Sequence, residues 1–221
     1  MIAGLLALAL LQAPIDQGTL VIRQDSVDVA HEGFRLTAGR LSAGAAGWSL
    51  AATVRYDRVR PVLSLAPILE VDADSSPLTL QYDVADPREP LRILGQVGRG
   101  RFTVRIITRS VERAREFPAN GSTVVLDDSV YALYLFAAWR AGTAPTTINA
   151  IFPRGLRRET LTVTDLGLAA VTVNHAALTL RHVTVRGGVN GLVDQWLDAA
   201  GHLQRIDVPS RHIVVERLPS S

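Results

Sequence analysis

Arginine side chains form the most regular charged pattern in this sequence. Four of them fall on odd positions of one short segment: Arg99, Arg101, Arg105 and Arg109. Apolar residues fill the even positions 102, 104 and 106 between them, so a strand here would be basic on one face and apolar on the other. That face could meet an anionic partner, such as lipid head groups or nucleic-acid phosphates, or it could be a solvated surface neutralised by nearby glutamates.

Nucleic acid is the less favoured of these partners. No aromatic residue lies on the arginine face to stack with bases, and the net charge of the whole chain is only +2. We therefore predict no nucleic-acid partner.

Other residue types that support catalysis do not form a recognisable pattern. The chain has no cysteine and no lysine, which excludes thiolate chemistry, Schiff bases and a P-loop, and it has no G-x-S-x-G elbow. The histidines show neither an H-E-x-x-H helix nor an i, i+2 strand pair, so we predict no metal site. They are His31, His175, His182, His202 and His212.

Two pairs of carboxylates remain as possible acids. Asp72 and Asp74 suit a polar turn, and Asp127 with Asp128 suits the start of a helix. A glycosidase-type dyad assembles only in the fold, so a hydrolase stays open as a third hypothesis. From the motifs themselves we predict a protein without catalytic residues or cofactors.

The elements that position these residues have a period of two rather than 3.6. Residues 77–84 alternate clearly, and similar segments are separated by Gly, Pro and Asp clusters without a strand–helix–strand rhythm. The pattern predicts a mainly β protein, an antiparallel meander that forms a curved sheet or half-open barrel. The other strands are expected over residues 18–25, 27–41, 47–58, 61–71, 91–97, 100–110, 122–126, 148–152, 159–165, 169–174, 176–186, 190–197, 203–208 and 211–217.

One segment, about residues 128–141, is predicted to be helical. Asp127 and Asp128 offer an N-cap, a run rich in Ala and Leu follows, Arg140 lies in the last turn and Gly142 comes next. The run is apolar on nearly all sides, so we expect it to pack on or in the sheet.

The first thirteen residues, MIAGLLALALLQA, are apolar and uncharged. They predict a signal peptide over residues 1–13, followed by a single antiparallel β domain over residues 14–221, in a periplasmic or secreted protein. No positive charge precedes the run, so a buried N-terminal element of a cytosolic protein is the alternative. The run and the helix are both shorter than the ~20 apolar residues of a spanning helix, so we do not expect an integral membrane protein.

Several stretches resemble uncharacterised exported bacterial β-proteins. They are residues 18–23, 113–118 and 126–129, and the run from Gln195-Trp196-Leu197-Asp198 to Arg205-Ile206-Asp207-Val208-Pro209, which is similar to the W-L-D-x-x-G-x-L hairpin of secreted domains of unknown function. Strands curving around a helix also look distantly like the half-open barrels of periplasmic lipoprotein carriers. That resemblance implies a hydrophobic cavity with a helical lid.

Aromatic residues on the predicted helix and a late strand are the candidate ligand-binding residues, although the default interpretation of such residues is that they fill a core. They are Tyr131, Tyr134, Phe136, Trp139 and Trp196. The leading hypothesis is therefore a non-catalytic envelope protein that binds a lipid or another hydrophobic molecule in a sheet–helix cavity. The alternative is a scaffold that holds an envelope protein partner through a sheet edge or the arginine face.

Overall fold

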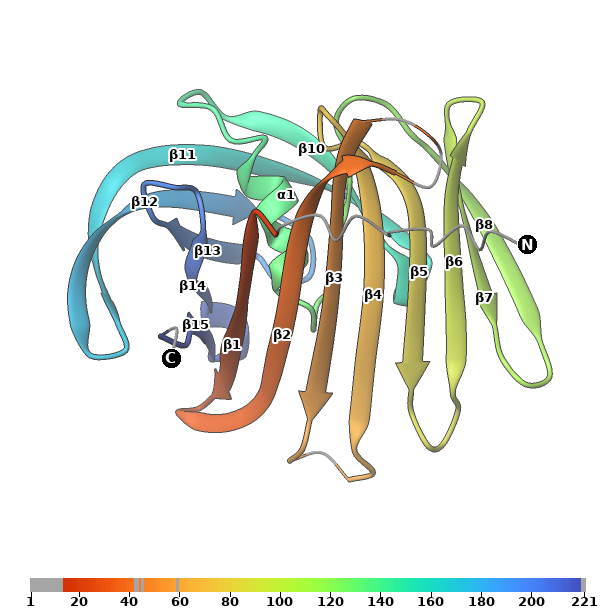
Figure 1. Cartoon of the computed structure of the whole chain (residues 1–221), viewed down its shortest axis with the longest axis horizontal. Coiled ribbons are helices and arrows are strands. Elements are labelled where there is room, and N and C mark those ends of the chain that lie inside the picture. The colour runs from red at the N-terminus through yellow and green to blue at the C-terminus, as the bar shows by residue number, and fades with distance from the viewer. Residues whose placement is uncertain (1–13, 42–43, 45, 59, 220–221) are drawn as a thin grey trace, which may run out of the picture.

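The computed structural model describes residues 14–41, 44, 46–58 and 60–219, so the predicted signal peptide lies outside the described residues. These residues form one sheet of fifteen strands, in the order β8-β7-β6-β5-β4-β3-β2-β1-β15-β14-β13-β12-β11-β10-β9 (Figure 1). Every neighbouring pair is antiparallel except β9 with β10. The predicted antiparallel meander is thereby confirmed.

The first eight strands follow one another along the sheet. They are β1 (Asp16–Gln24), β2 (Val27–Arg40), β3 (Ala46–Tyr56), β4 (Leu63–Asp72), β5 (Pro77–Ala85), β6 (Leu91–Gly98), β7 (Arg101–Ile107) and β8 (Glu112–Pro118).

The second half of the chain contains the helical turns and the remaining strands. They are β9 (Thr123–Val125), η1 (Ala132–Tyr134), α1 (Leu135–Ala138), β10 (Thr146–Phe152), η2 (Pro153–Gly155), β11 (Arg157–Val173), β12 (Ala176–Arg186), β13 (Leu192–Leu197), β14 (Leu203–Val208), η3 (Pro209–Arg211) and β15 (Ile213–Arg217).

Pairing of β1 with β15 joins the two halves into one continuous sheet. The sheet curls around the helix, but β8 and β9 are its two ends and do not pair with each other, so the barrel stays open (Figure 1). A barrel closes only when its last strand pairs with its first, and here the seam between β8 and β9 interrupts that ring. The prediction of a half-open barrel is confirmed.

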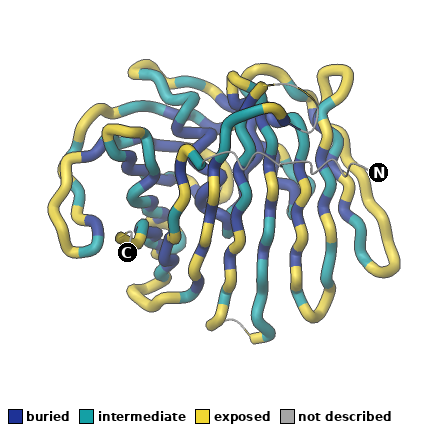
Figure 2. The backbone as a smooth tube through the Cα atoms, viewed as in Figure 1, coloured by how far each residue is buried: buried dark blue, intermediate teal, exposed yellow. Residues whose placement is uncertain are grey.

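Residues that alternate between buried and exposed along the strands supply the core, and Figure 2 shows the buried ones in dark blue. In β5, for example, Leu80, Tyr82 and Val84 are buried in one large cluster that also contains the helix. Gly95 lies opposite Leu80 in the pairing of β5 with β6, and a Cβ there would come 2.6 Å from the ring of Phe102. Glycine is required at this position because the aromatic ring fills the space of a side chain.

The helix is present but shorter than predicted, since regular helix extends only over residues 132–138. Its first turn is a 3-10 turn without a side-chain cap from its own N-cap residue, Tyr131. No helix of the described ranges is long and apolar enough to cross a membrane.

Two differences from the predicted strands affect the surface. β8 was not predicted, because its residues are exposed apart from Phe117 and show little apolar alternation. β11 is one strand of 17 residues rather than two, with an irregularity in its pairing between Asp165 and Leu168.

Candidate functional site

The start of the helix is held by a carboxylate from a distant strand. Both oxygens of Glu32, on β2, accept backbone hydrogen bonds, from Tyr131 N at 2.8 Å and Ala132 N at 2.9 Å. Burial raises the pKa of Glu32 to about 7, although these hydrogen bonds oppose the rise. The expected cap by Asp127 and Asp128 is wrong, because both of these side chains face arginines instead.

Asp127 forms a buried ion pair beside the helix start. Its carboxylate accepts four hydrogen bonds: two from the Arg154 guanidinium at 2.7 Å, one from the Tyr82 hydroxyl at 3.1 Å and one from Ser129 N at 2.8 Å. Burial disfavours the charged form of Arg154, yet the hydrogen bonds and charge of Asp127 outweigh it, so the arginine pKa is raised. A carboxylate bound in this way anchors the chain rather than acting as a base.

Asp128 forms a second pair next to the first. Arg157 Nη2 donates to its carboxylate at 2.6 Å, and Asn190 Nδ2 donates at 3.1 Å. The guanidinium of Arg211 donates to the backbone carbonyl of Asp128 at 2.6 Å, and Arg157 Nε donates to Glu159 at 2.7 Å. Hydrogen bonds and ion pairs therefore connect the segment that precedes the helix to β11 and to the turns before β13 and β15.

These two ion pairs border a hollow of about 260 Å³, which we call the seam hollow. Its lining residues are Asp127, Asp128, Phe152, Arg154, Gly155 and Arg157. The guanidinium of Arg157 also lies over the ring of Phe152, 4.1 Å from its centroid. The hollow is polar, with two arginines whose positions are fixed by carboxylates.

The predicted aromatic residues of the helix pack into the protein core. Tyr131, Tyr134 and Phe136 are buried, and Phe136 meets Trp139 edge to face at 5.2 Å. Trp139 also packs against Trp48 of β3. Four of the five predicted residues thus lie together, among core side chains.

Trp196 lies apart from them, on the opposite face of the sheet. It forms a second buried cluster with Val173 and Leu180 of the β11–β12 hairpin. Its ring stacks on His182 at 4.8 Å, and His182 in turn contacts Asp194 at 2.8 Å. The hairpin curls back over this face, and Trp196 is the side chain that it covers.

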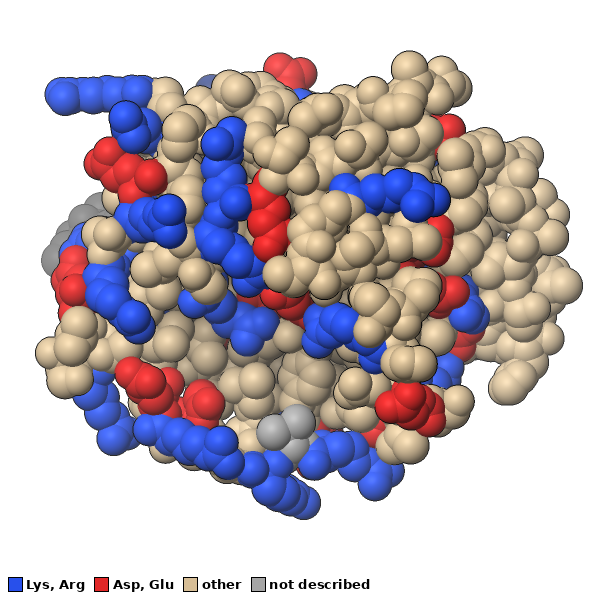
Figure 3. Space-filling view, turned by 180° about the vertical axis from the view of Figure 1, so that it is seen from behind, with Lys and Arg blue, Asp and Glu red and all other residues tan. Residues whose placement is uncertain are grey.

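The same hairpin forms an uncharged part of the surface. Residues 166–180 contain no Asp, Glu, Lys or Arg, and they form the wholly tan lobe at the right of Figure 3. Leu166 is 54% exposed, Leu168 75% and Leu178 38%. An ion pair between Arg181 and Asp165, 2.8 Å apart, marks the base of the lobe.

A groove of about 510 Å³ runs beside the tip of this hairpin, and we call it the hairpin groove. Its two walls differ in chemistry, since the hairpin side is apolar and the side formed by the β13–β14 turn and β14 is polar. It is lined by Val173, Asn174, Ala176, Leu178, Asp198, His202, Gln204, Arg217, Leu218 and Pro219.

The predicted arginine face is divided by the structure. Arg101 and Arg105 point outward from β7 and pair with carboxylates of the neighbouring β8, Arg101 with Glu116 at 3.7 Å and Arg105 with Glu112 at 2.7 Å. Arg99 and Arg109 lie in the turns before and after β7, at opposite ends of the strand.

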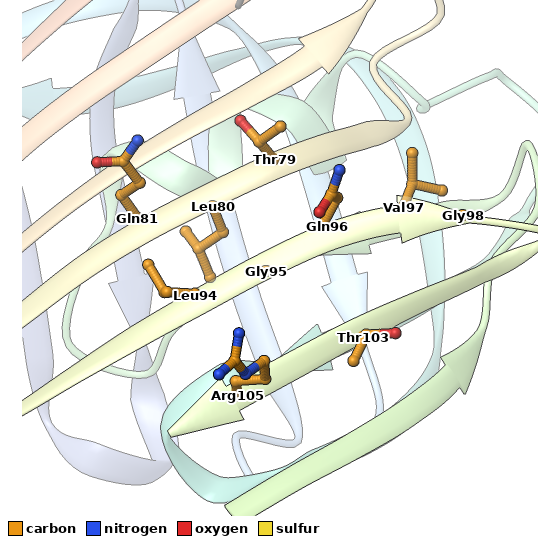
Figure 4. Close-up of a pocket in the computed structure, with 10 residues that line it drawn as sticks. All are labelled: Thr79, Leu80, Gln81, Leu94, Gly95, Gln96, Val97, Gly98, Thr103 and Arg105. Atoms are coloured by element: carbon orange, nitrogen blue, oxygen red, sulfur yellow. The ribbon is translucent and has the colours of Figure 1, made fainter. Parts of the chain in front are cut away.

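Arg105 also borders a shallow hollow of about 610 Å³ across β5, β6 and β7 (Figure 4). Its other lining residues are uncharged, and include Thr79, Gln81, Gln96 and Thr103. Ion pairing and the uncharged lining leave little net positive charge on this face.

Sequence reasoning missed the residues that matter most around the helix. Glu32 gave no local signal, and Arg154 and Arg157 stood in no motif. Only their contacts in the fold reveal them. Within the described ranges, His, Asp and Glu side chains do not gather in a group that could hold a metal ion.

The fold defines a class of open, β-barrel-like proteins in which one large antiparallel sheet curls around a short helix. No family model matches the chain, and no curated protein matches its sequence. A solved structure of similar fold is a beta-barrel-like protein of the domain of unknown function DUF1849 from Brucella abortus, at 12% identity and a TM-score of 0.53. The match covers 93% of this chain and 98% of that one, so the likeness extends over the whole fold.

A DUF1089 family protein from Pseudomonas aeruginosa is more weakly similar, with 14% identity, 96% coverage of both chains and a TM-score of 0.43. That score is too low to support an argument.

Proposed function

We propose that this chain is a non-catalytic interaction module that binds an extended, apolar segment of a partner protein in the hairpin groove. The observation that carries the proposal is the open edge of β12. Its residues 181–186 pair with β13, while for residues 176–180 no strand in the described part of the chain covers the second edge. An exposed strand edge with free backbone donors and acceptors is a template for another strand.

Side chains around this edge suit an uncharged partner. A strand added there would run along the hairpin groove and contact Val173, Ala176 and Leu178 on the apolar wall. The polar wall offers His202 and Gln204, which could bind the backbone or polar side chains of the added segment.

The exposed strand edges of β8 and β12 differ in a way that supports this choice. β8, at one end of the sheet, carries Glu112, Arg113, Arg115 and Glu116, and charges of this kind discourage pairing with other chains. The edge of β12 carries Ala, Leu and Thr instead. The edge of β8 is thus protected by charges against pairing with another strand, whereas the edge of β12 is not.

A photoreactive residue placed at position 178 in the native host tests the proposal. We expect a crosslink to one extended segment, and the corresponding synthetic peptide should bind the purified protein. Leu178→Glu should weaken that binding by ~10-fold, since it introduces a charge into a partly buried apolar contact. Position 111 is the matched control, both for the photoreactive residue and for the substitution by glutamate, because Val111 is 53% exposed but lies in the β7–β8 turn. Equal crosslinking from both positions, or peptide binding that ignores Leu178→Glu, would contradict the proposal.

A lipid or other hydrophobic molecule is the second candidate for this groove. The favouring observation is its size, about 510 Å³, which is within the usual range of small-molecule sites, together with the apolar wall at Leu178. A ligand between sheet and helix would instead have to displace Tyr131, Tyr134 and Phe136, which are packed in the core. Displacement of a fluorescent fatty acid that depends on Leu178 would favour the lipid over the peptide.

We also propose that the protein is exported to the bacterial envelope. The support is the uncharged apolar run at residues 1–13. Cell fractionation with N-terminal sequencing tests it. We expect a mature protein that begins near Pro14 outside the cytoplasm, whereas a cytoplasmic protein that retains the run would contradict it.

A further inference from the structure

The seam hollow is lined by two arginines that are already oriented before any ligand binds. Arg154 uses Nε and Nη2 to hold Asp127, and Arg157 uses Nε for Glu159 and Nη2 for Asp128. Neither Nη1 group donates a hydrogen bond to another residue in the described ranges. Each guanidinium is therefore fixed along one side, and both arginines line the hollow.

Ion pairs to buried and half-buried carboxylates hold the two arginines in place. The Asp127 side chain is only 3% exposed, while the side chains of Arg154 and Arg157 are 29% and 31% exposed. Each arginine thus has an anchored part inside the protein and a part that solvent or a ligand can reach. Preorganised donors of this kind lose little conformational entropy when they bind an oxyanion.

Further guanidiniums lie near the two arginines of the hollow. Asp127, Asp128 and Glu159 pair with Arg154 and Arg157 themselves. Two more guanidiniums lie close by and are bound to backbone carbonyls rather than to carboxylates: Arg115 to Leu156 O at 2.8 Å, and Arg211 to Asp128 O at 2.6 Å. These two guanidiniums add further donor groups to the region, and Glu32, which lies close to Asp127, adds a fourth carboxylate.

The position of the Arg157 guanidinium beside the hollow depends on a glycine between the two arginines. A Cβ at Gly155 would come 2.9 Å from Arg157 Nη1, so the absent side chain leaves room for the donor. The hollow of about 260 Å³ is large enough for a phosphate group together with water.

We propose that the seam hollow is a binding site for a phosphate group, with Arg154 and Arg157 as its donors. Two guanidinium groups with fixed orientation suit phosphate, whose oxygens can accept from several planar donors at once. The group could belong to a lipid head group or to a soluble phosphate compound. The site is separate from the hairpin groove, and the proposal does not depend on the function suggested for that groove.

Calorimetric titration of the full chain with inorganic phosphate at low ionic strength tests the site. We expect saturable binding, and Arg157→Gln should weaken it by at least ~10-fold, because a charge-assisted hydrogen bond is lost. Arg158→Gln is the matched control, since it removes the same charge from the exposed neighbouring position. Absence of saturable binding, or an equal loss in both variants, would overturn the proposal.

Gly155→Ala is the second variant, because it changes no charge and keeps both arginines. We expect it to weaken phosphate binding by at least ~3-fold, since its methyl group displaces the Arg157 donor. If Arg157→Gln fails to fold, this variant decides: a folded Gly155→Ala protein with unchanged phosphate affinity would overturn the proposal.

Phosphatidylcholine vesicles with and without phosphatidylglycerol then distinguish the source of the phosphate. Sedimentation with the anionic vesicles that Arg157→Gln abolishes would assign a lipid head group to the site. Phosphate binding without any vesicle binding would assign a soluble phosphate compound.

Discussion

Substitution of Glu32 by glutamine should change how the stability of this protein depends on pH. Glu32 is fully buried, and its carboxylate holds the first turn of the helix through Tyr131 N and Ala132 N. Burial raises its pKa from 4.5 to about 7 in the folded protein. Glutamine has nearly the same shape but does not titrate. Its amide nitrogen cannot accept from the second backbone N–H, so Glu32→Gln lowers stability by an amount that does not depend on pH and removes the pH dependence of this one group.

The magnitude follows from the two pKa values. Between pH 4.5 and about 7 the folded protein keeps the proton on Glu32, whereas the unfolded chain releases it. The contribution of Glu32 to stability is therefore greatest below pH 4.5 and falls as the pH rises to 7. The separation of the two values corresponds to ~3 kcal/mol of unfolding free energy.

Urea unfolding of both proteins from about pH 4 to about pH 8 measures this difference. The wild-type protein should lose ~3 kcal/mol relative to Glu32→Gln across the range. Glu89→Gln serves as the control for the loss of a glutamate as such, because Glu89 is exposed in the turn between β5 and β6. Parallel curves for wild type and Glu32→Gln would refute the link between burial, pKa and stability at this site.

Three further substitutions test the packing of the fold. Gly95→Ala should destabilise the protein by ~1–3 kcal/mol in chemical denaturation, because its Cβ would overlap the ring of Phe102. Asp127→Ala should cost ~2–3 kcal/mol in the same assay, less than a fully buried pair, since Arg154 can still reach solvent. Trp196→Ala should release the β11–β12 hairpin, so hydrogen exchange of residues 166–180 should accelerate while the strands β1–β7 keep their protection. Unchanged stability in the first two variants, or unchanged exchange in the third, would contradict these contacts.

Local patterns in the sequence were sufficient to predict much of the fold. The hairpin near the C-terminus is an example, because Asp198 and Gly201 encode its turn within a few residues. In the structure the Asp198 carboxylate accepts hydrogen bonds from Ala200 N and His202 N, and Gly201 has a positive φ of 83°. Turn chemistry of this kind depends only on neighbours in the chain.

The candidate sites were less predictable, because their residues meet across long stretches of chain. Glu32 reaches the helix start from a strand about a hundred residues earlier, and its neighbours in the sequence do not predict that it binds the helix. The same is true of Arg154, whose partner Asp127 lies 27 residues away. Trp196 was grouped with the helix aromatics, yet its strand turns the side chain to the opposite face of the sheet.

The arginine pattern separates what the sequence determines from what only the tertiary structure decides. The sequence by itself determined that Arg101 and Arg105 share one face of a strand, because the period of two is a property of the extended backbone. Only the tertiary structure decided that β8 lies alongside and neutralises them, that Arg154 and Arg157 meet at the seam, and that an uncharged hairpin extends from the sheet. Strand order and the curl of the sheet bring these groups together, and both depend on contacts between residues far apart in the chain.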